Sequence, residues 1–197
     1  MRVAALPAEG EIREKGSRFL AVLRPVAGEE EAKSALAELA RRFPDATHRC
    51  WAWRLGQPPR ERRSDAGEPA GTAGVPILRA LRGAELWGVL AVVVRWFGGV
   101  KLGKGGLARA YTAATQEALV RLAALGGIAE RTPAVTLTLE VPYERLGAVK
   151  RLLHPPEVEL IEAEYGVRAR LVLRVHAARK ETLEESLAGL GVPKPPA

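Results

Sequence analysis

Cysteine is almost absent from this chain, and asparagine is missing altogether. Cys50 is the single cysteine among 197 residues, which excludes an internal disulfide and any metal site with several cysteine ligands. We expect no bound metal and no cofactor. Side-chain amides are limited to Gln57 and Gln116, and arginine far outnumbers lysine. This depletion of heat-labile amides favours a thermophilic source, although a GC-rich coding sequence would produce part of the same bias.

Long hydrophobic runs are also lacking. No apolar stretch reaches the roughly 18 to 20 residues that a membrane-spanning helix requires. The segment from Met1 to Gly10 lacks the basic and then apolar pattern of a signal peptide. We therefore expect a folded cytoplasmic protein with no membrane partner, and its length allows one large domain or two small ones.

Acidic residues are absent from one long segment, between Glu85 and Glu117. The whole chain carries a net charge of +7. Residues 1–130 hold 20 basic and 14 acidic side chains, whereas residues 131–197 hold 10 and 9, so the excess lies in the first part. A basic surface of this kind favours RNA or another acidic partner, but it does not indicate a fold.

Hydrophobic periodicity predicts alternating strands and helices before a boundary near residue 130. Helices are expected at 29–43, 75–81 and 107–125, strands within 11–26 and at 47–55 and 86–97, and a long exposed loop at 57–74. Glycines, charges and a proline then interrupt both periodicities at 126–133, which predicts domains at 1–130 and 131–197.

The second predicted domain has the order strand, helix, strand, strand, helix. These elements are expected at 134–141, 143–153, 157–164, 167–177 and 181–190. Such a βαββα order predicts an α+β sandwich with one antiparallel sheet. Arg168, Arg170, Arg174 and His176 share one face of the last strand, which is either a second nucleic-acid surface or a face neutralised by glutamates of the neighbouring strand.

The segment from Arg95 to Tyr111 combines five glycines with four cations and no acid. It follows an apolar strand and precedes a helix, so backbone N–H groups and the helix dipole favour an anion there. We predict a site for RNA phosphates or another anion. Its residues are Arg95, Gly98, Gly99, Lys101, Gly103, Lys104, Gly105, Gly106 and Arg109.

Three other interpretations of this segment remain open. Gly98 to Lys104 matches a P-loop as far as Gly-x4-Gly-Lys, but Gly105 stands where the Mg²⁺-binding Ser or Thr is needed. Gly103, Gly105 and Ala108 fit G-x-G-x-x-A, but the helix continues where that fingerprint expects an acidic residue. The glycines could also form only a tight turn beside a sheet.

A second polar loop runs from Ser64 to Gly74. Asp65, Glu68 and Thr72, with His48 nearby, would form a hydrolytic site if this loop folded back onto the glycine-rich segment. Turn formation and helix capping explain the same residue types. His48 and Cys50 leave the same face of a strand, but i and i+2 positions stand roughly 6 to 7 Å apart, which disfavours a nucleophile–base pair.

Both loops resemble those of the YigZ/IMPACT family. The resemblance rests on Ser64 to Gly74 with Pro76-Ile77-Leu78, on Arg95 to Gly103, and on Gly105 to Tyr111; Ala46 to Ala52 is a weaker element. It implies an N-terminal α/β sandwich similar to a ribosomal-protein domain and to domain four of elongation factor G. It also implies a ferredoxin-like C-terminal domain, similar to domain five of that factor. The chain departs from the family's Asp-Asp-Gly-Glu-Pro pattern at Ala66, which puts a metal or acid–base role of this loop in doubt.

The resemblance implies a regulatory role in translation, because the eukaryotic relatives are translational regulators that act through protein contacts. Together with the charge distribution, it predicts a non-enzymatic protein that binds RNA or the ribosome. Two alternatives remain. One is an enzyme for a phosphate-containing small molecule that uses Asp65, Glu68 and His48; the other is a module whose exposed segment from Arg54 to Arg63 binds an acidic protein.

Overall fold

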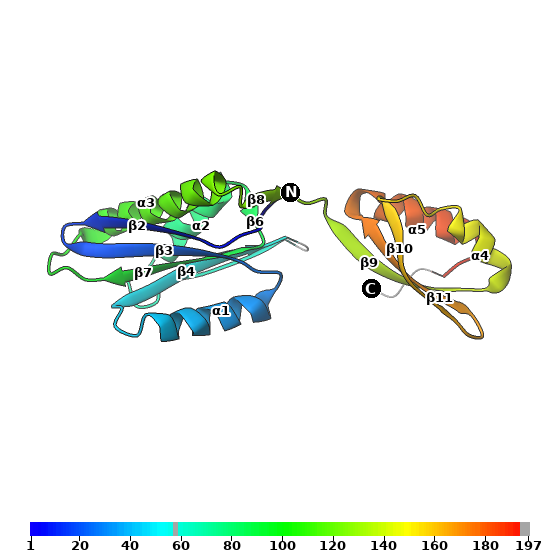
Figure 1. Cartoon of the computed structure of the whole chain (residues 1–197), viewed down its shortest axis with the longest axis horizontal. Coiled ribbons are helices and arrows are strands. Elements are labelled where there is room, and N and C mark those ends of the chain that lie inside the picture. Colours follow the sequence, from blue (N-terminus) through cyan, green and yellow to red (C-terminus); the bar gives the residue numbers. More distant parts are fainter. Residues whose placement is uncertain (57–58, 194–197) are drawn as a thin grey trace. The chain divides into compact units, whose positions relative to one another are not determined.

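The chain forms two compact units, Met1–Arg131 and Thr132–Ala197, each with its own sheet and hydrophobic core (Figure 1). The structure is a computed structural model that describes residues 1–56 and 59–193. Residues 57 and 58, at the start of the expected long loop, lie outside the described residues. Two units that each combine helices with a sheet confirm the predicted α+β class.

The first unit is built on a five-stranded antiparallel sheet in the order β2-β3-β7-β4-β5. Its strands are β2 (Ala8–Glu14), β3 (Ser17–Pro25), β4 (His48–Leu55), β5 (Arg60–Ser64) and β7 (Val89–Trp96). A tight turn at Lys15 and Gly16 joins β2 to β3, and both residues have positive φ angles, as such hairpin turns require.

Helices cover both faces of this sheet (Figure 1). Helix α1 (Glu29–Arg42) packs on one face, whereas α2 (Gly74–Gly83) and α3 (Gly103–Ala124) pack on the other. The central strand β7 contributes Ala91 and Val93 to the α2/α3 side and Val92 and Val94 to the α1 side. Burial on both faces explains why this strand is almost continuously apolar.

Helix α3 lies unusually close to β2 at Gly10. A Cβ added at Gly10 would stand 2.3 Å from the backbone nitrogen of Ala118, a distance that side-chain carbons do not adopt. The glycine therefore allows the middle of α3 to rest directly on the sheet.

Three short strands form a separate sheet in the order β6-β1-β8. They are β1 (Arg2–Ala4), β6 (Leu86–Trp87) and β8 (Ile128–Glu130). Neither β1 nor β8 was expected, since three residues are too few to show a periodicity. Met1 and Arg131 extend this pairing, because the Arg131 N–H donates to the Met1 carbonyl at 2.8 Å.

Two other expectations are wrong. Residues 60–64 form strand β5 rather than a loop; this edge strand carries mainly charged side chains, which hide the alternation that would reveal it. Helix α3 begins at Gly103 and not at Leu107, so the second half of the glycine-rich segment is helical. Three glycines among the first four helical residues oppose helix propensity, which explains why the sequence pattern starts late.

The second unit has the predicted βαββα order. It comprises β9 (Ala134–Val141), α4 (Tyr143–Lys150), β10 (Val158–Tyr165), β11 (Ala169–His176), a short 3₁₀ turn η1 (Ala177–Arg179) and α5 (Lys180–Gly189), with the antiparallel sheet order β10-β11-β9.

Two of the four residues named for the charged face of this second sheet, Arg170 and Arg174, form ion pairs across strands. Arg174 pairs with Glu159 at 2.5 Å and Arg170 with Glu164 at 3.1 Å, and both pairs are direct register partners. This supports the neutralised interpretation of that face over a second nucleic-acid surface. In neither unit does a described helix have the length and apolarity needed to span a membrane.

Candidate functional site

The carboxylate of Asp65 binds the backbone that leads into α2. It accepts hydrogen bonds from the N–H groups of Gly71 at 2.9 Å, Ala73 at 3.0 Å and Gly74 at 2.8 Å. Burial acts to raise the pKa of Asp65, but these three bonds outweigh it and hold the pKa below its ordinary value. Asp65 thus caps α2 from a distance along the chain, which leaves its oxygens engaged within the loop.

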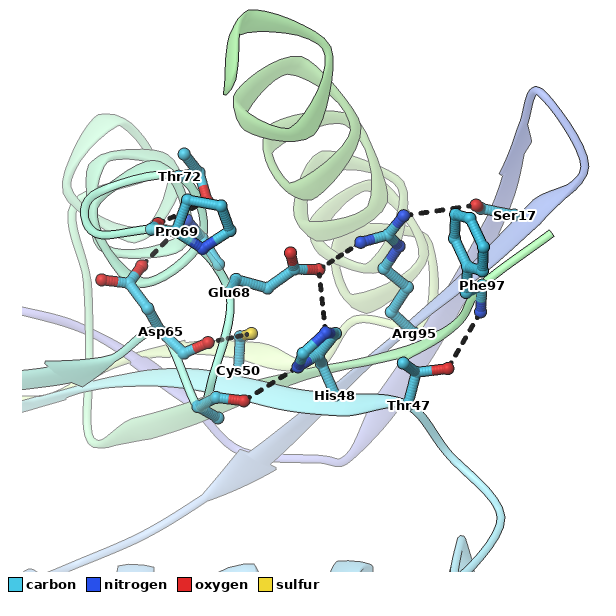
Figure 2. Close-up of polar contacts among 12 residues, drawn as sticks. Ser17, Thr47, His48, Cys50, Asp65, Glu68, Pro69, Thr72, Arg95 and Phe97 are labelled. Carbon is cyan, nitrogen blue, oxygen red and sulfur yellow. Dashed lines mark hydrogen bonds and ion pairs between the residues drawn. The ribbon is translucent and has the colours of Figure 1, made fainter. Parts of the chain in front are cut away.

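Glu68 lies under the same loop as the centre of a buried polar cluster (Figure 2). Its Oε1 accepts a hydrogen bond from Arg95 Nη1 at 2.5 Å and another from the Tyr111 hydroxyl at 2.8 Å. His48 Nε2 stands 4.0 Å from the same oxygen. The loop therefore does fold back onto the glycine-rich segment, and it contacts the first and last residues of that segment.

Cys50 and His48 each have a partner of their own within this cluster (Figure 2). The Cys50 thiol donates to the carbonyl of Asp65 at 2.8 Å, and burial raises its pKa to about 12. His48 Nδ1 lies 3.0 Å from the carbonyl of Ala66. A buried thiol that stays protonated at neutral pH is a poor nucleophile, so the pair does not form a Cys-His dyad.

Thr72 and Tyr111 complete the closure of this loop. The Thr72 hydroxyl donates to the carbonyl of Pro69 at 2.7 Å and is buried. Burial raises the pKa of Tyr111, so its hydroxyl remains a donor to Glu68. The structure brings together His48, Asp65, Glu68 and Thr72 as predicted, but most of their polar atoms are bound to each other or to backbone.

In the predicted anion site Arg95 is buried, and the N–H of Gly98 is engaged although the residue is exposed. Arg95 is only 5% exposed and is paired with Glu68. The N–H of Gly98 donates to Ser17 Oγ at 3.1 Å, and a Cβ at Gly98 would stand 1.9 Å from the carbonyl carbon of Gly16. Gly98 is therefore a packing glycine that lets the β2–β3 turn rest against the loop, a contact that sequence spacing could not reveal.

Beyond Gly98 the glycine-rich segment is exposed. Gly99, Lys101, Gly103, Lys104, Gly105 and Arg109 all lie on the surface, and Gly106 is half-buried. The first turn of α3 contains no acidic residue, and its N-cap position, Leu102, makes no side-chain capping hydrogen bond. No side chain of the first turn or of the N-cap therefore neutralises the positive end of the helix dipole, and Lys101 and Lys104 lie on either side of this end in the sequence.

The cations around this helix end lack acidic partners. Within residues 1–56 and 59–131, Lys101, Lys104 and Arg109 form no ion pair. Lys15 is also exposed, forms no ion pair with any residue that the structure describes, and precedes the glycine that packs on Gly98. The sequence analysis missed Lys15, although its place beside a turn glycine was a usable signal.

A groove of about 370 Å³ runs between α2 and α3. Its lining includes Arg79, Arg109, Thr112 and Gln116. Arg79 was not predicted; it is exposed on α2 and, like Arg109, has no ion pair among the described residues. The groove thus extends the basic surface along α3, and we use "α3 basic surface" for Lys15, Arg79, Lys101, Lys104 and Arg109.

Of the arginines from Arg54 to Arg63, Arg54 is buried, in contrast to the expectation of an exposed basic segment, whereas Arg60, Arg62 and Arg63 are exposed. The Nε of Arg54 donates to Glu61 at 2.8 Å, and its guanidinium lies 3.8 Å from the ring centre of Trp87. Arg60 and Arg62 pair with Glu29 of α1. Arg60, Arg62 and Arg63 are nevertheless exposed, so the hypothesis of an acidic protein partner at this segment stays a prediction.

No cluster of three or more His, Cys, Asp or Glu side chains suited to a metal occurs among the described residues. Asp65 and Glu68, the carboxylates of the loop, are bound to backbone N–H groups and to Arg95 and Tyr111 respectively.

Each of the two units contains a match to a known family model. Residues 15–119 match the family model of the Impact N-terminal domain, and residues 139–190 match a domain of unknown function, DUF1949. The chain is 36% identical over 177 residues to IMPACT family member YigZ of Escherichia coli, covering 88% of this chain and 85% of the relative. It is 44% identical over 162 residues to the IMPACT family member in the pol 5′ region of Thermus thermophilus, covering 81% and 84%.

A solved structure described as that of a hypothetical protein has the same architecture. It is 32% identical, with a TM-score of 0.71, and the match covers 100% of this chain and 96% of the other. Both family models follow one another in the order in which the two units occur here. The chain belongs to the IMPACT family.

Proposed function

We propose that this protein is a cytoplasmic, translation-associated regulatory protein that binds RNA or the ribosome through the α3 basic surface. Family membership supports a role in the regulation of translation, since eukaryotic relatives are translational regulators. The finer part, contact with RNA phosphates, rests on the chemistry of the surface itself.

The observation that carries the proposal is the contrast between paired and unpaired cations. Arg54, Arg82 and Arg95 are all held by glutamates of the same unit. Lys101, Lys104 and Arg109 flank an uncapped helix end and have no such partner among the described residues. Unpaired cations beside free backbone N–H groups suit the phosphate oxygens of a nucleic acid.

Salt dependence of RNA binding tests this directly. Each phosphate neutralised on a single strand lowers the slope of log K against log salt by about 0.7. If Lys101, Lys104 and Arg109 each neutralise one phosphate, the slope is about −2.1 and the affinity falls about 20-fold between 50 and 200 mM salt. Fluorescence anisotropy with a labelled oligoribonucleotide measures both quantities.

Alanine variants assign the effect to this surface. Lys104→Ala should make the slope shallower by about 0.7. Arg121→Ala is the matched control, because Arg121 is an exposed arginine on the same helix but is paired with Glu117 at 3.0 Å; it should leave the slope unchanged. Binding that does not respond to salt, or that responds equally to both substitutions, would contradict the proposal.

The enzymatic alternative is less well supported by the same geometry. The Asp65 carboxylate accepts three backbone N–H groups, and Glu68 is neutralised by Arg95. Neither carboxylate is placed to take a proton from a substrate on the α3 basic surface. Of the residues considered for that alternative, Glu68 is buried, whereas His48, with 22% of its side chain accessible, and Asp65 are partly exposed.

A further inference from the structure

We propose that Phe97 is a stacking platform for a base of single-stranded RNA. This inference rests on the proposed function and specifies its ligand: a single strand whose phosphates follow the α3 basic surface while one base lies on the Phe97 ring. A duplex, whose bases are stacked inside the helix, could use the cations but not the ring.

Phe97 is unusual among the aromatic residues of the first unit. It is 47% exposed, and every other aromatic side chain from residue 1 to 131 is buried or half-buried. It lies four residues before Lys101, at the end of β7, where the chain leaves the sheet for the glycine-rich segment. An exposed ring next to unpaired cations is the arrangement that binds single strands without sequence preference.

Backbone hydrogen bonds and a contact with Arg95 fix the position of Phe97 (Figure 2). Its N–H donates to the Thr47 hydroxyl at 3.0 Å, and the next N–H, of Gly98, donates to Ser17. The Arg95 guanidinium lies 5.5 Å from the Phe97 ring centre and 5.4 Å from that of Phe19 in the core. The ring is thus held in place before a ligand arrives, which lowers the entropic cost of binding.

The buried pair of Arg95 and Glu68 also supports the ring of Phe97. Glu68 holds Arg95 in place at 2.5 Å, and Arg95 in turn contacts the inner side of Phe97. The charge of Arg95 is compensated inside the protein, so Arg95 supports the ring rather than the phosphates. Phe97 supplies stacking, whereas Lys101, Lys104 and Arg109 supply the salt-dependent attraction.

The experiment compares two RNAs and three variants of the full chain. Fluorescence anisotropy at fixed salt follows binding of a labelled 12-nucleotide oligouridine and of a blunt RNA duplex of the same length. Phe97→Ala should weaken binding of the single strand about 5- to 160-fold, the range found for loss of one base–aromatic stack. Phe97→Tyr, which keeps the ring, should retain the affinity.

Val100→Ala is the matched control. Val100 is 51% exposed, lies in the same loop and has no aromatic ring, so its truncation should leave both affinities unchanged. Phe97→Ala should also leave the salt slope unchanged, because no charge is removed. Circular dichroism of each variant checks that the fold is retained, and the Tyr variant provides the comparison if the Ala variant unfolds.

The outcomes separate this inference from the proposed function. If both RNAs bind with a salt-dependent affinity and Phe97→Ala weakens neither, the stacking platform is wrong while the basic surface stands. If Phe97→Ala and Val100→Ala weaken binding equally, or Phe97→Tyr is as weak as Phe97→Ala, the ring has no stacking role. If neither RNA binds, both proposals fail, and a protein partner becomes the better account of the exposed ring.

Discussion

Two glycine-rich loops of the first unit differ in whether their polar groups bind one another or face solvent. In the loop from Asp65 to Gly74, carboxylates, hydroxyls and backbone N–H groups bind one another and the core. In the segment from Gly99 to Arg109, cations and N–H groups face solvent with no acidic side chain between Glu85 and Glu117 to neutralise them. The first loop is closed on itself, whereas the second is left open to a ligand.

Because of this difference between the two loops, we expect substitutions in one to change stability and substitutions in the other to change binding. Substitutions in the closed loop should lower the free energy of unfolding, because they strand buried polar groups. Substitutions in the open segment should change affinity for an anion and leave stability nearly unaltered. Unfolding in urea, followed by tryptophan fluorescence, is well suited to the comparison, since all four tryptophans lie in the first unit.

The largest expected effect is at Glu68. Glu68→Ala leaves the buried Arg95 guanidinium without its counter-charge and should lower the free energy of unfolding by about 3 to 5 kcal/mol. Glu117→Ala, which removes the exposed partner of Arg121, is the control and should cost less than about 1 kcal/mol. A loss below 1 kcal/mol at Glu68 would show that the cluster is not essential for the closed loop.

Asp65 should show the next largest effect, and it should depend on pH. Asp65→Asn weakens three bonds to backbone N–H groups and should cost about 2 kcal/mol at pH 7. The pKa of Asp65 is lowered in the folded state from its ordinary value of 3.8, so its contribution is complete above that value and is lost as the pH falls through the folded-state pKa.

The difference in unfolding free energy between wild type and Asp65→Asn should therefore narrow as the pH falls below 3.8. Urea titrations at pH 7, 4 and 3 measure this narrowing. A difference that stays constant over this range would mean that the lowered pKa makes no net contribution to folding.

A smaller effect of opposite sign is expected at Ala66. Its φ of 44° lies in the left-handed region, which alanine adopts only at a cost. Ala66→Gly should therefore raise the free energy of unfolding by up to about 1 kcal/mol. Ala70→Gly, in the same loop but without a positive φ, should not be stabilising; equal gains at both positions would rule out the backbone explanation.

The smallest effect on stability should come from the open segment. Lys101→Ala and Lys104→Ala remove exposed cations that have no ion-pair partner among the described residues, so the free energy of unfolding should change by less than about 0.5 kcal/mol. A larger loss would mean that these lysines belong to the fold, and the contrast between the two loops would disappear.

The strongly periodic elements could be predicted from the sequence, whereas the state of individual polar groups could not. Helix α1 and the βαββα order of the second unit were evident from apolar spacing alone. Strand β5 was hidden by its charged side chains, and the first turn of α3 by its glycines. Sequence reasoning grouped Arg95 with Lys101 and Lys104 because they are neighbours in the chain.

That grouping failed for a physical reason. Arg95 leaves β7 on the face that is covered by the closed loop, so Glu68, distant in the sequence, neutralises it. Register with the neighbouring strands decides which side of a sheet a residue faces, and a single sequence does not specify that register across the sheet. Lys15 belongs to the α3 basic surface because its neighbour Gly16 contacts Gly98. That contact joins residues far apart in the chain, so a single sequence does not specify it either.

The pairing of β1 with β8 has a practical consequence for dissecting this protein. The N-terminal strand closes the first unit by joining its last strand, with Val3 opposite Ala129. A fragment that begins at residue 15, where the family match begins, would lack the β1–β8 pairing and also β2, the edge strand on which α3 packs. A fragment spanning 1–131 keeps both strands, and is therefore the fragment in which the proposed binding of RNA by this unit should be tested.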